Sequence, residues 1–298
     1  MKNSEGYCAL CKKYGNLQKS HIIPKFIGRN LKKSSATQKM VKISNPYKPV
    51  QDIEKEYLLC KECEEKFSLY EKWFSEHIFY PEQQGVDFIL IDKRLFYFIT
   101  SVNWRRLLVD VNFQEDSLTQ NEIKCLKEST EEMRLFLNGE NTQLPYIENH
   151  IYFIDNYFST DNHNSILEKF HRSQLELKHS IGGRTWKSSD NHTIGITSIM
   201  KGIAIFTLLK FPGDSSSLGT KVLNNDKQCW LFVHNQHLPD SCYNEFEFLL
   251  EEITQARDKA NPAYQEKIMQ RIKSCGKDFY QTETWDLMKK DIKRINQK

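Results

Sequence analysis

The sequence predicts an α+β protein with a small zinc-binding domain at its N-terminus, and three observations support this prediction. Two C-x-x-C pairs lie in the first quarter of the chain. Short segments rich in β-branched and aromatic residues occur together with longer segments whose apolar residues recur at helical spacing. The 298 residues, of which 39% are hydrophobic, also suffice to build a sizeable core.

Positive charge is concentrated at the N-terminus. Residues 1–50 contain ten lysines and one arginine but a single acid, Glu5, so this segment carries +10. The rest of the chain carries −7, which gives +3 overall. A basic block on a mildly acidic body is typical of a protein that binds a polyanion, although a solvated lysine-rich surface would give the same composition. DNA is therefore an expected partner.

The sequence contains no membrane or export segment that we can identify. No apolar run reaches the roughly 20 residues needed to span a bilayer. The opening residues MKNSEGYCALCKK lack the apolar stretch of a signal peptide. We therefore expect a cytoplasmic protein without membrane contact, in which a disulfide framework is not favoured.

Four of the eight cysteines form the pairs CALC (Cys8 and Cys11) and CKEC (Cys60 and Cys63). Each pair supplies two thiolates from one tight turn, and two such turns brought together make the tetrahedral shell that zinc prefers. A redox use of either pair is the alternative, but no thioredoxin-like context surrounds the two pairs. Because four thiolates close the shell, the predicted Zn²⁺ is structural.

The second pair leads into a predicted helix over residues 63–79, whose aromatic and aliphatic residues recur at helical spacing. A short strand is expected at 56–60, directly before it. The order is therefore a cysteine turn, a strand that carries His21, an insert, a second strand, the other cysteine turn and a helix. This order predicts a treble-clef outline with a ββα unit inside it.

With these pieces in this order, residues 8 to about 79 resemble an HNH endonuclease of the ββα-metal superfamily. The matching segments are CALC, SHIIP at 20–24 and LLCKECE at 58–64. The resemblance implies a metal-dependent endonuclease that hydrolyses phosphodiester bonds in DNA, and it suggests a regulated nuclease in prokaryotic defence. It covers about a quarter of the chain, and the remainder resembles no family that we recognise.

The resemblance implies that His21 is the general base and that one divalent metal, Mg²⁺ or Mn²⁺, lies beside it at the start of the helix. Hydrolysis of a phosphodiester needs a base to activate water and a cation to stabilise the leaving oxygen. Glu64 stands where the family has its metal-binding histidine, and a carboxylate suits a hard cation. A purely structural histidine at position 21 is the alternative.

The sequence departs from the family pattern at two further positions. Ser20 stands where an aspartate or another ligand precedes the histidine, and Lys55 stands where an asparagine is expected. A further oxygen ligand is therefore needed, and the sequence does not choose among the acids that could provide it or remain solvated. These candidates, besides Ser20, are Asp52, Glu54, Glu56 and Glu71.

Basic residues surround His21 in the sequence, and we expect them to contact phosphates without reading bases. The residues assigned to this nucleic-acid-binding surface are Lys19, Lys25, Arg29, Lys32 and Lys33. The segment 31–50 is rich in Ser, Thr, Asn and Pro and is expected to be a loop that orders on DNA.

A turn-rich segment at 79–85 places a boundary near residue 82 and divides the chain into domains 1–82 and 83–298. The larger domain is expected to be α+β and to act as a sensor, regulator or docking unit for a protein partner or a second copy. Arg105 and Arg106 are expected to extend from a core helix to the surface, and the histidines after residue 149 to be surface groups. The expected helices are 86–111, about 121–138 and about 240–296, the expected strands are within 149–155, 193–211 and 228–235, and the expected loop is 211–220.

Three functions fit these features. The first is the nuclease, and the second is a catalytically inactive, zinc-containing module that binds nucleic acid. The third is a protein-interaction domain that uses the zinc fold as a scaffold, which the basic block disfavours. An acid that approaches both Glu64 and His21 would favour the nuclease.

Overall fold

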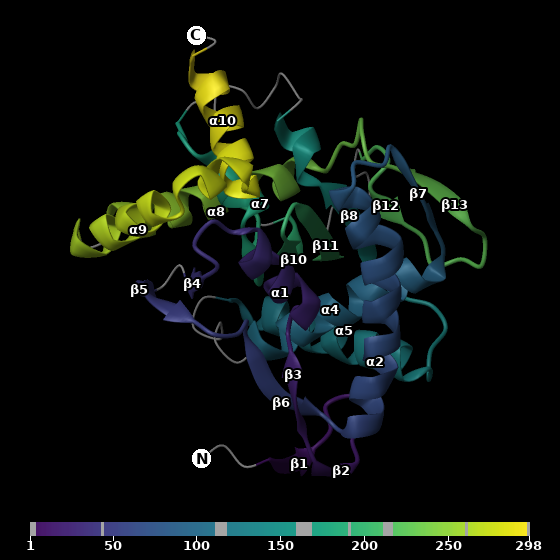
Figure 1. Cartoon of the computed structure of the whole chain (residues 1–298). Coiled ribbons are helices and arrows are strands. Elements are labelled where there is room, and N and C mark those ends of the chain that lie inside the picture. The colour runs from purple at the N-terminus through teal and green to yellow at the C-terminus, as the bar shows by residue number, and fades with distance from the viewer. Residues whose placement is uncertain are drawn as a thin grey trace.

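The computed structural model describes residues 4–42, 45–110, 118–158, 169–189, 192–210, 217–259 and 262–296 (Figure 1). Helices make up 51% of the structure and strands 23%, which confirms the mixed α+β composition. Among the described residues, no helix is both long and apolar enough to cross a membrane.

The elements keep the labels of Figure 1. The strands are β1 Glu5–Tyr7, β2 Tyr14–Asn16, β3 Gln18–His21, β4 Met40–Lys42, β5 Asn45–Val50, β6 Lys55–Leu59, β7 Phe88–Ile91, β8 Glu148–Phe153, β9 Ile181–Lys187, β10 Ile194–Met200, β11 Ile203–Lys210, β12 Lys221–Val222 and β13 Cys229–Phe232. The helices are α1 Lys25–Ser34, α2 Lys61–Phe74, α3 Tyr80–Gln83, α4 Lys93–Asp110, α5 Gln120–Asn138, α7 Ser173–Lys178, α8 Asp240–Asp258, α9 Pro262–Ser274 and α10 Glu283–Asn296, and a π-helix, η1 Ser75–Phe79, joins α2 to α3.

The N-terminal part combines three two-stranded antiparallel sheets with two helices. β1 pairs with β2, β3 with β6, and β4 with β5. α1 follows β3 after a short turn, and α2 follows β6 directly. The elements on either side of the two cysteine pairs therefore follow one another in the expected order.

A five-stranded antiparallel sheet lies at the centre of the molecule, in the order β12-β8-β11-β10-β9. Helices cover both of its faces, with α4 and α5 on one side and α8 on the other. On β11, Ile203 and Ile205 enter the first of two cores, whereas Ala204 and Phe206 enter the second. Because alternate residues of a strand point to opposite faces and helices cover both faces, every residue of β10 is buried.

α4 connects the two parts of the chain. All thirteen residues from Leu95 to Leu107 are buried, as expected for a helix that packs on several sides. It contacts α2 and α5 as well as the central sheet. One cluster of buried side chains consequently extends from Cys8 to Val233, across residue 82. The division into domains 1–82 and 83–298 stays a prediction.

The segment 31–50, expected to be a loop, contains the end of α1 and the β4–β5 hairpin instead. α1 is amphipathic, and Ile27 and Leu31 lie on its buried face. Gly28 on the same face approaches Ile53 so closely that a Cβ at position 28 would lie 2.9 Å from it. The lysines on the opposite face of α1 obscure this short apolar pattern in the sequence.

The segment 86–111, expected to be one helix, begins with strand β7 and becomes helical only at α4. Asp92 separates the two elements, since its side chain accepts a hydrogen bond from the backbone N–H of Arg94 in the first turn of α4. The apolar residues of β7 continue the helical spacing of α4 by coincidence. The sequence therefore predicts a helix where the structure has a strand.

The other expected helices and strands are confirmed. Of the expected loop 211–220, residues 211–216 lie outside the described residues. The expectation of surface histidines is wrong for His150, which is fully buried. Its Nδ1 lies 3.1 Å from Oγ1 of Thr220, and its Nε2 lies 3.4 Å from Oε2 of Glu148. Buried imidazoles take such partners because unpaired polar groups are unfavourable in a core.

Candidate metal centre and histidine site

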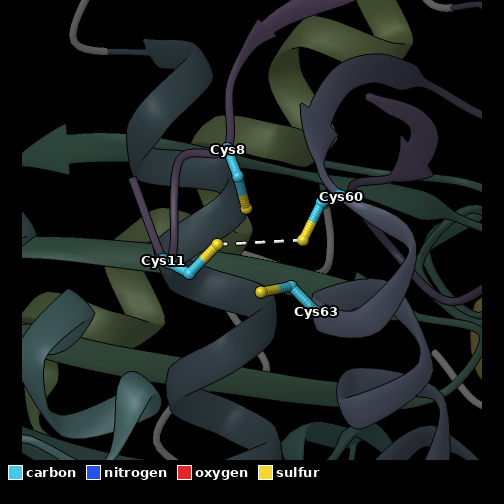
Figure 2. Close-up of side chains that lie close together, drawn as sticks. All are labelled: Cys8, Cys11, Cys60 and Cys63. Atoms are coloured by element: carbon cyan, nitrogen blue, oxygen red, sulfur yellow. Dashed lines mark hydrogen bonds between the residues drawn. The ribbon is translucent and has the colours of Figure 1, made fainter. Parts of the chain in front are cut away.

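Two tight turns bring four cysteines together. The first pair lies in the turn between β1 and β2, and the second lies where β6 passes into α2. The backbone N–H of Ala9 donates a 2.8 Å hydrogen bond to the carbonyl of Leu58, which holds the two turns side by side. The side chains that point into the space between the turns in Figure 2 are Cys8, Cys11, Cys60 and Cys63.

The spacing of the four sulfur atoms suits a metal ion. All four lie within 4.8 Å of one another, and 3.8 Å separates Sγ of Cys11 from Sγ of Cys60 (Figure 2). A regular tetrahedron of sulfurs with Zn–S bonds of about 2.3 Å has edges of about 3.8 Å. The four cysteines therefore form a group that can hold a metal ion such as zinc, as the sequence predicts.

Burial disfavours the charged thiolate forms of these cysteines unless a cation is bound. It raises the pKa of Cys63 far above its usual value and that of Cys60 to about 11. At Cys8 burial acts in the same direction, but backbone hydrogen bonds at Cys11 and Cys60 outweigh it and lower the pKa. Because the thiolate is the ligand, a cation has to displace the protons of Cys60 and Cys63 on binding.

His21 is the last residue of β3 and lies next to Asp52. Nε2 of His21 is 3.1 Å from Oδ2 of Asp52, and Nζ of Lys55 is 2.8 Å from the same oxygen. Burial alone would raise the pKa of Asp52, but the hydrogen bonds from Lys55 and His21 outweigh it and keep the pKa well below its usual value. Asp52 is therefore ionised at neutral pH, and it holds the His21 ring in one orientation.

Ser20 lies on the other face of β3, which packs toward α2. Its Oγ is buried and donates a 2.7 Å hydrogen bond to Oε2 of Glu64, in the first turn of α2. The two positions at which the family resemblance places metal ligands are thus in direct contact, 44 residues apart in sequence.

Two arginines of α4 reach the same region from the distant part of the chain. Arg105 donates a 2.7 Å hydrogen bond to the carbonyl of His21, and its Nη2 lies 2.8 Å from Oε1 of Glu71. Arg106 pairs with Glu54 at 2.6 Å. The arginine side chains are only 1% and 7% exposed, so the expectation that they extend to the surface is wrong. Burial raises the pKa of Glu71, and the charge of Arg105 opposes that rise.

The candidate acids take different hydrogen-bond and ion-pair partners, although Glu71 lies near enough to Glu64 and His21 for the charges of both to act on its pKa. Asp52 bonds His21, whereas Glu54 and Glu71 pair with the arginines of α4, and Glu56 lies opposite Ser20 in the β3–β6 register. Among the described residues, the cysteine cluster is the one group of three or more His, Cys, Asp or Glu side chains whose ligand atoms come together.

The sequence did not reveal how His21 is held. The sequence offers Asp52 as a metal ligand or a solvated acid, and Arg105 as a side chain that extends to the surface. They lie 31 and 84 residues from His21 in the sequence, and no local motif signals either contact.

The predicted nucleic-acid-binding residues lie on β3 and α1. Lys25, Arg29 and Lys33 are exposed and spaced four residues apart, so they follow one side of α1, here called the basic face of α1. Nζ of Lys19 lies 5.3 Å from the centre of the Tyr57 ring, and Nζ of Lys32 donates to the carbonyl of Gln51, beside Asp52. These contacts place α1 next to the loop that carries the partner of His21.

Comparison with known proteins finds no matching family model, no matching curated protein and no matching solved structure. The functional assignment therefore rests on the residues of this chain and their geometry.

Proposed function

We propose that this chain is a metal-dependent endonuclease of the HNH type, which hydrolyses phosphodiester bonds in DNA with His21 as general base. One observation carries the proposal: beside a four-cysteine metal group, the paired strands β3 and β6 and the start of α2 hold a His21–Asp52 pair and a Ser20–Glu64 pair at consecutive residues of β3. In this proposal the zinc-bound turns form a treble clef that fixes the β3–β6 sheet against α2. Prokaryotic defence belongs to the proposal through the resemblance alone, and a cytoplasmic location through the expectation that the sequence has no export or membrane segment.

His21 is placed to act as a base. Its side chain is 16% exposed, which admits water, and Asp52 occupies its Nε2. Nδ1 then accepts a proton from a water molecule whose oxygen attacks phosphorus, while the ester P–O bond breaks and the leaving oxygen departs. The ionised Asp52 stabilises the imidazolium that forms, and Arg105 fixes the backbone of His21.

A divalent cation, expected as Mg²⁺ or Mn²⁺, would supply stabilisation of the leaving oxygen. Protein sites for Mg²⁺ commonly use one or two carboxylates together with substrate phosphates. Glu64 provides one such carboxylate, and the hydroxyl of Ser20 donates a hydrogen bond to it. These two residues are the ones that would hold the cation.

The basic side chains provide sequence-independent affinity. The basic face of α1 and Lys19 are exposed, and none of these residues pairs with a carboxylate among the described residues. A hollow between α1 and β5 is lined by further polar and basic side chains, including Lys32 and Lys39. Phosphates bound along this surface would pass next to His21.

A second candidate function is a catalytically inactive zinc-containing module that binds nucleic acid. One observation favours it: Glu64 already accepts the hydrogen bond of Ser20, and Glu71 is paired with Arg105, so neither carboxylate is held open for a cation. The zinc group and the basic surface would be the same in both functions.

Nicking of supercoiled plasmid in Mg²⁺ or Mn²⁺ separates these functions. The test compares wild type with His21→Ala and with His234→Ala, a matched control because His234 also lies beside an aspartate, 3.3 Å from Asp87, on the surface. All three proteins are first shown to contain equal zinc. Nicking by wild type and His234→Ala but not by His21→Ala supports the nuclease. Salt-sensitive binding by all three without nicking supports the binding module, and equal nicking by all three refutes the role of His21.

A further inference from the structure

The two-stranded sheet of β7 and β13 is apolar on both of its faces. The antiparallel register pairs Phe88 with Phe232, Ile89 with Leu231, and Leu90 with Trp230. Ile89, Ile91 and Leu231 point inward and belong to the large core. The opposite face carries four large apolar side chains with exposed fractions of 52%, 39%, 57% and 62%, namely Phe88, Leu90, Trp230 and Phe232, here called the aromatic face.

The aromatic face is a continuous surface. The rings of Phe88 and Trp230 meet edge to face with centroids 5.1 Å apart, and those of Phe88 and Phe232 are 6.5 Å apart. An antiparallel sheet with one solvated face normally alternates apolar and polar residues, so apolar residues on the solvent side need another explanation. At about 200 Å² for each aromatic side chain, and roughly half of it exposed, the face leaves about 400 Å² of apolar surface in water.

Polar side chains lie at both ends of the aromatic face. At one end are two ion pairs, Lys93–Asp226 at 2.5 Å and Arg94–Asp92 at 2.5 Å, and at the other end His234 lies 3.3 Å from Asp87. A two-fold interface sets each surface against a copy of itself, so a rim of one sign would repel. A rim in which each acid lies beside a base avoids this repulsion, and it offers no field that would attract a polyanion.

We propose that two copies of this chain pair through the aromatic face, around a two-fold axis. Pairing would remove about 800 Å² of apolar surface from the two copies together, and the rims would extend the contact toward the roughly 1,200–2,000 Å² of a specific interface. In Figure 1, β7 and β13 lie at the right-hand margin, on the side away from the β4–β5 hairpin. The pairing therefore leaves α1 and β3 uncovered and does not depend on the proposed nuclease activity.

The test is the mass of the full chain in solution, measured by light scattering after size exclusion and by sedimentation between about 1 and 100 µM. The wild type should have twice the mass of one chain at the upper concentrations, and Trp230→Lys/Phe232→Lys should be monomeric. Tyr146→Lys is the matched control because Tyr146 is 73% exposed outside this sheet, and it should remain dimeric.

Circular dichroism establishes whether each variant folds. If the double variant does not fold, the single variant Phe88→Lys takes its place in the test. A wild type that is monomeric at all concentrations overturns the proposal, as does a dimer that persists in the folded lysine variants. If the wild type is monomeric, the aromatic face would have to bind a different protein. A dimer that is lost only in the aromatic-face variants supports the pairing of two copies.

Discussion

The contact between Arg105 and Glu71 should stabilise the protein and the histidine site together. Arg105 is 1% exposed and donates to the carbonyl of His21, while its ion pair with Glu71 joins α4 to α2. Replacing Arg105 by Met keeps the length and the apolar stem of the side chain. It leaves the carboxylate of Glu71 largely buried and without its cation.

The structure sets the expected size of the effect. Removing one partner of a buried ion pair destabilises a protein by about 3–5 kcal/mol. The side chain of Glu71 is 21% exposed, which screens part of its charge and favours the lower limit, about 3 kcal/mol. For a chain of this length, that change lowers the midpoint of thermal unfolding by about 5 °C.

A double-mutant cycle tests this reasoning. The free energy of unfolding in urea is measured for zinc-loaded wild type, Arg105→Met, Glu71→Gln and the double variant. Since the second substitution removes the charge left unpaired by the first, the double variant should lose less stability than the sum of the single variants, by about 1–3 kcal/mol. Losses that add to within about 0.5 kcal/mol would refute the coupling.

Three further predictions concern the metal group, the response to acid and the basic surface. We expect each chain to bind one zinc ion at the four cysteines, and Cys63→Ser should lose it and unfold at a lower temperature. Cys229→Ser, at an exposed cysteine, should keep the zinc and the unfolding temperature of wild type. Equal zinc in both variants by atomic absorption would contradict the four-cysteine site. Burial alone would raise the pKa of Glu283, but hydrogen bonds from its histidine and lysine neighbours lower it to about 2 from its usual 4.5, so stability should be lost as the pH falls from about 4.5 toward 2. Glu283→Gln should flatten that part of the stability profile measured by thermal melts, and an unchanged slope would count against the assignment. Alanine at all three positions of the basic face of α1 should weaken the salt dependence of binding to a DNA duplex. The slope of the logarithm of the association constant against log salt concentration should become smaller by about 2–3. Lys72→Ala, which removes a lysine near Glu76, should leave this slope unchanged.

The local chemistry of the metal group could be predicted from sequence, because each cysteine pair sits in a turn that is defined by its own few residues. α2 and the C-terminal helices were also predictable, since their apolar residues repeat over several turns. α1 was missed because it has only ten residues, and its lysine-rich outer face resembles a loop. β7 was missed because a four-residue strand is too short for its period of two to override the neighbouring helical pattern.

The environment of His21 could not be predicted for a different reason. Its position at the end of a strand follows from the local sequence, but its ring partner Asp52 and its backbone anchor Arg105 come from a loop and from α4. Which carboxylate pairs with which base depends on how the β3–β6 sheet, α2 and α4 pack. Periodicity and composition carry no information on that packing, so the acids near His21 remained interchangeable in the sequence.

The most direct test of the central claim is chemical rescue of His21→Ala by imidazole in the plasmid-nicking assay, with zinc content matched to wild type. The cavity left by the ring lies beside Asp52 and is open to water, so free imidazole can take the place of the lost base. We predict that His21→Ala is inactive alone and regains nicking in proportion to imidazole, whereas wild type does not respond. Nicking by His21→Ala at the wild-type rate without imidazole would contradict the account.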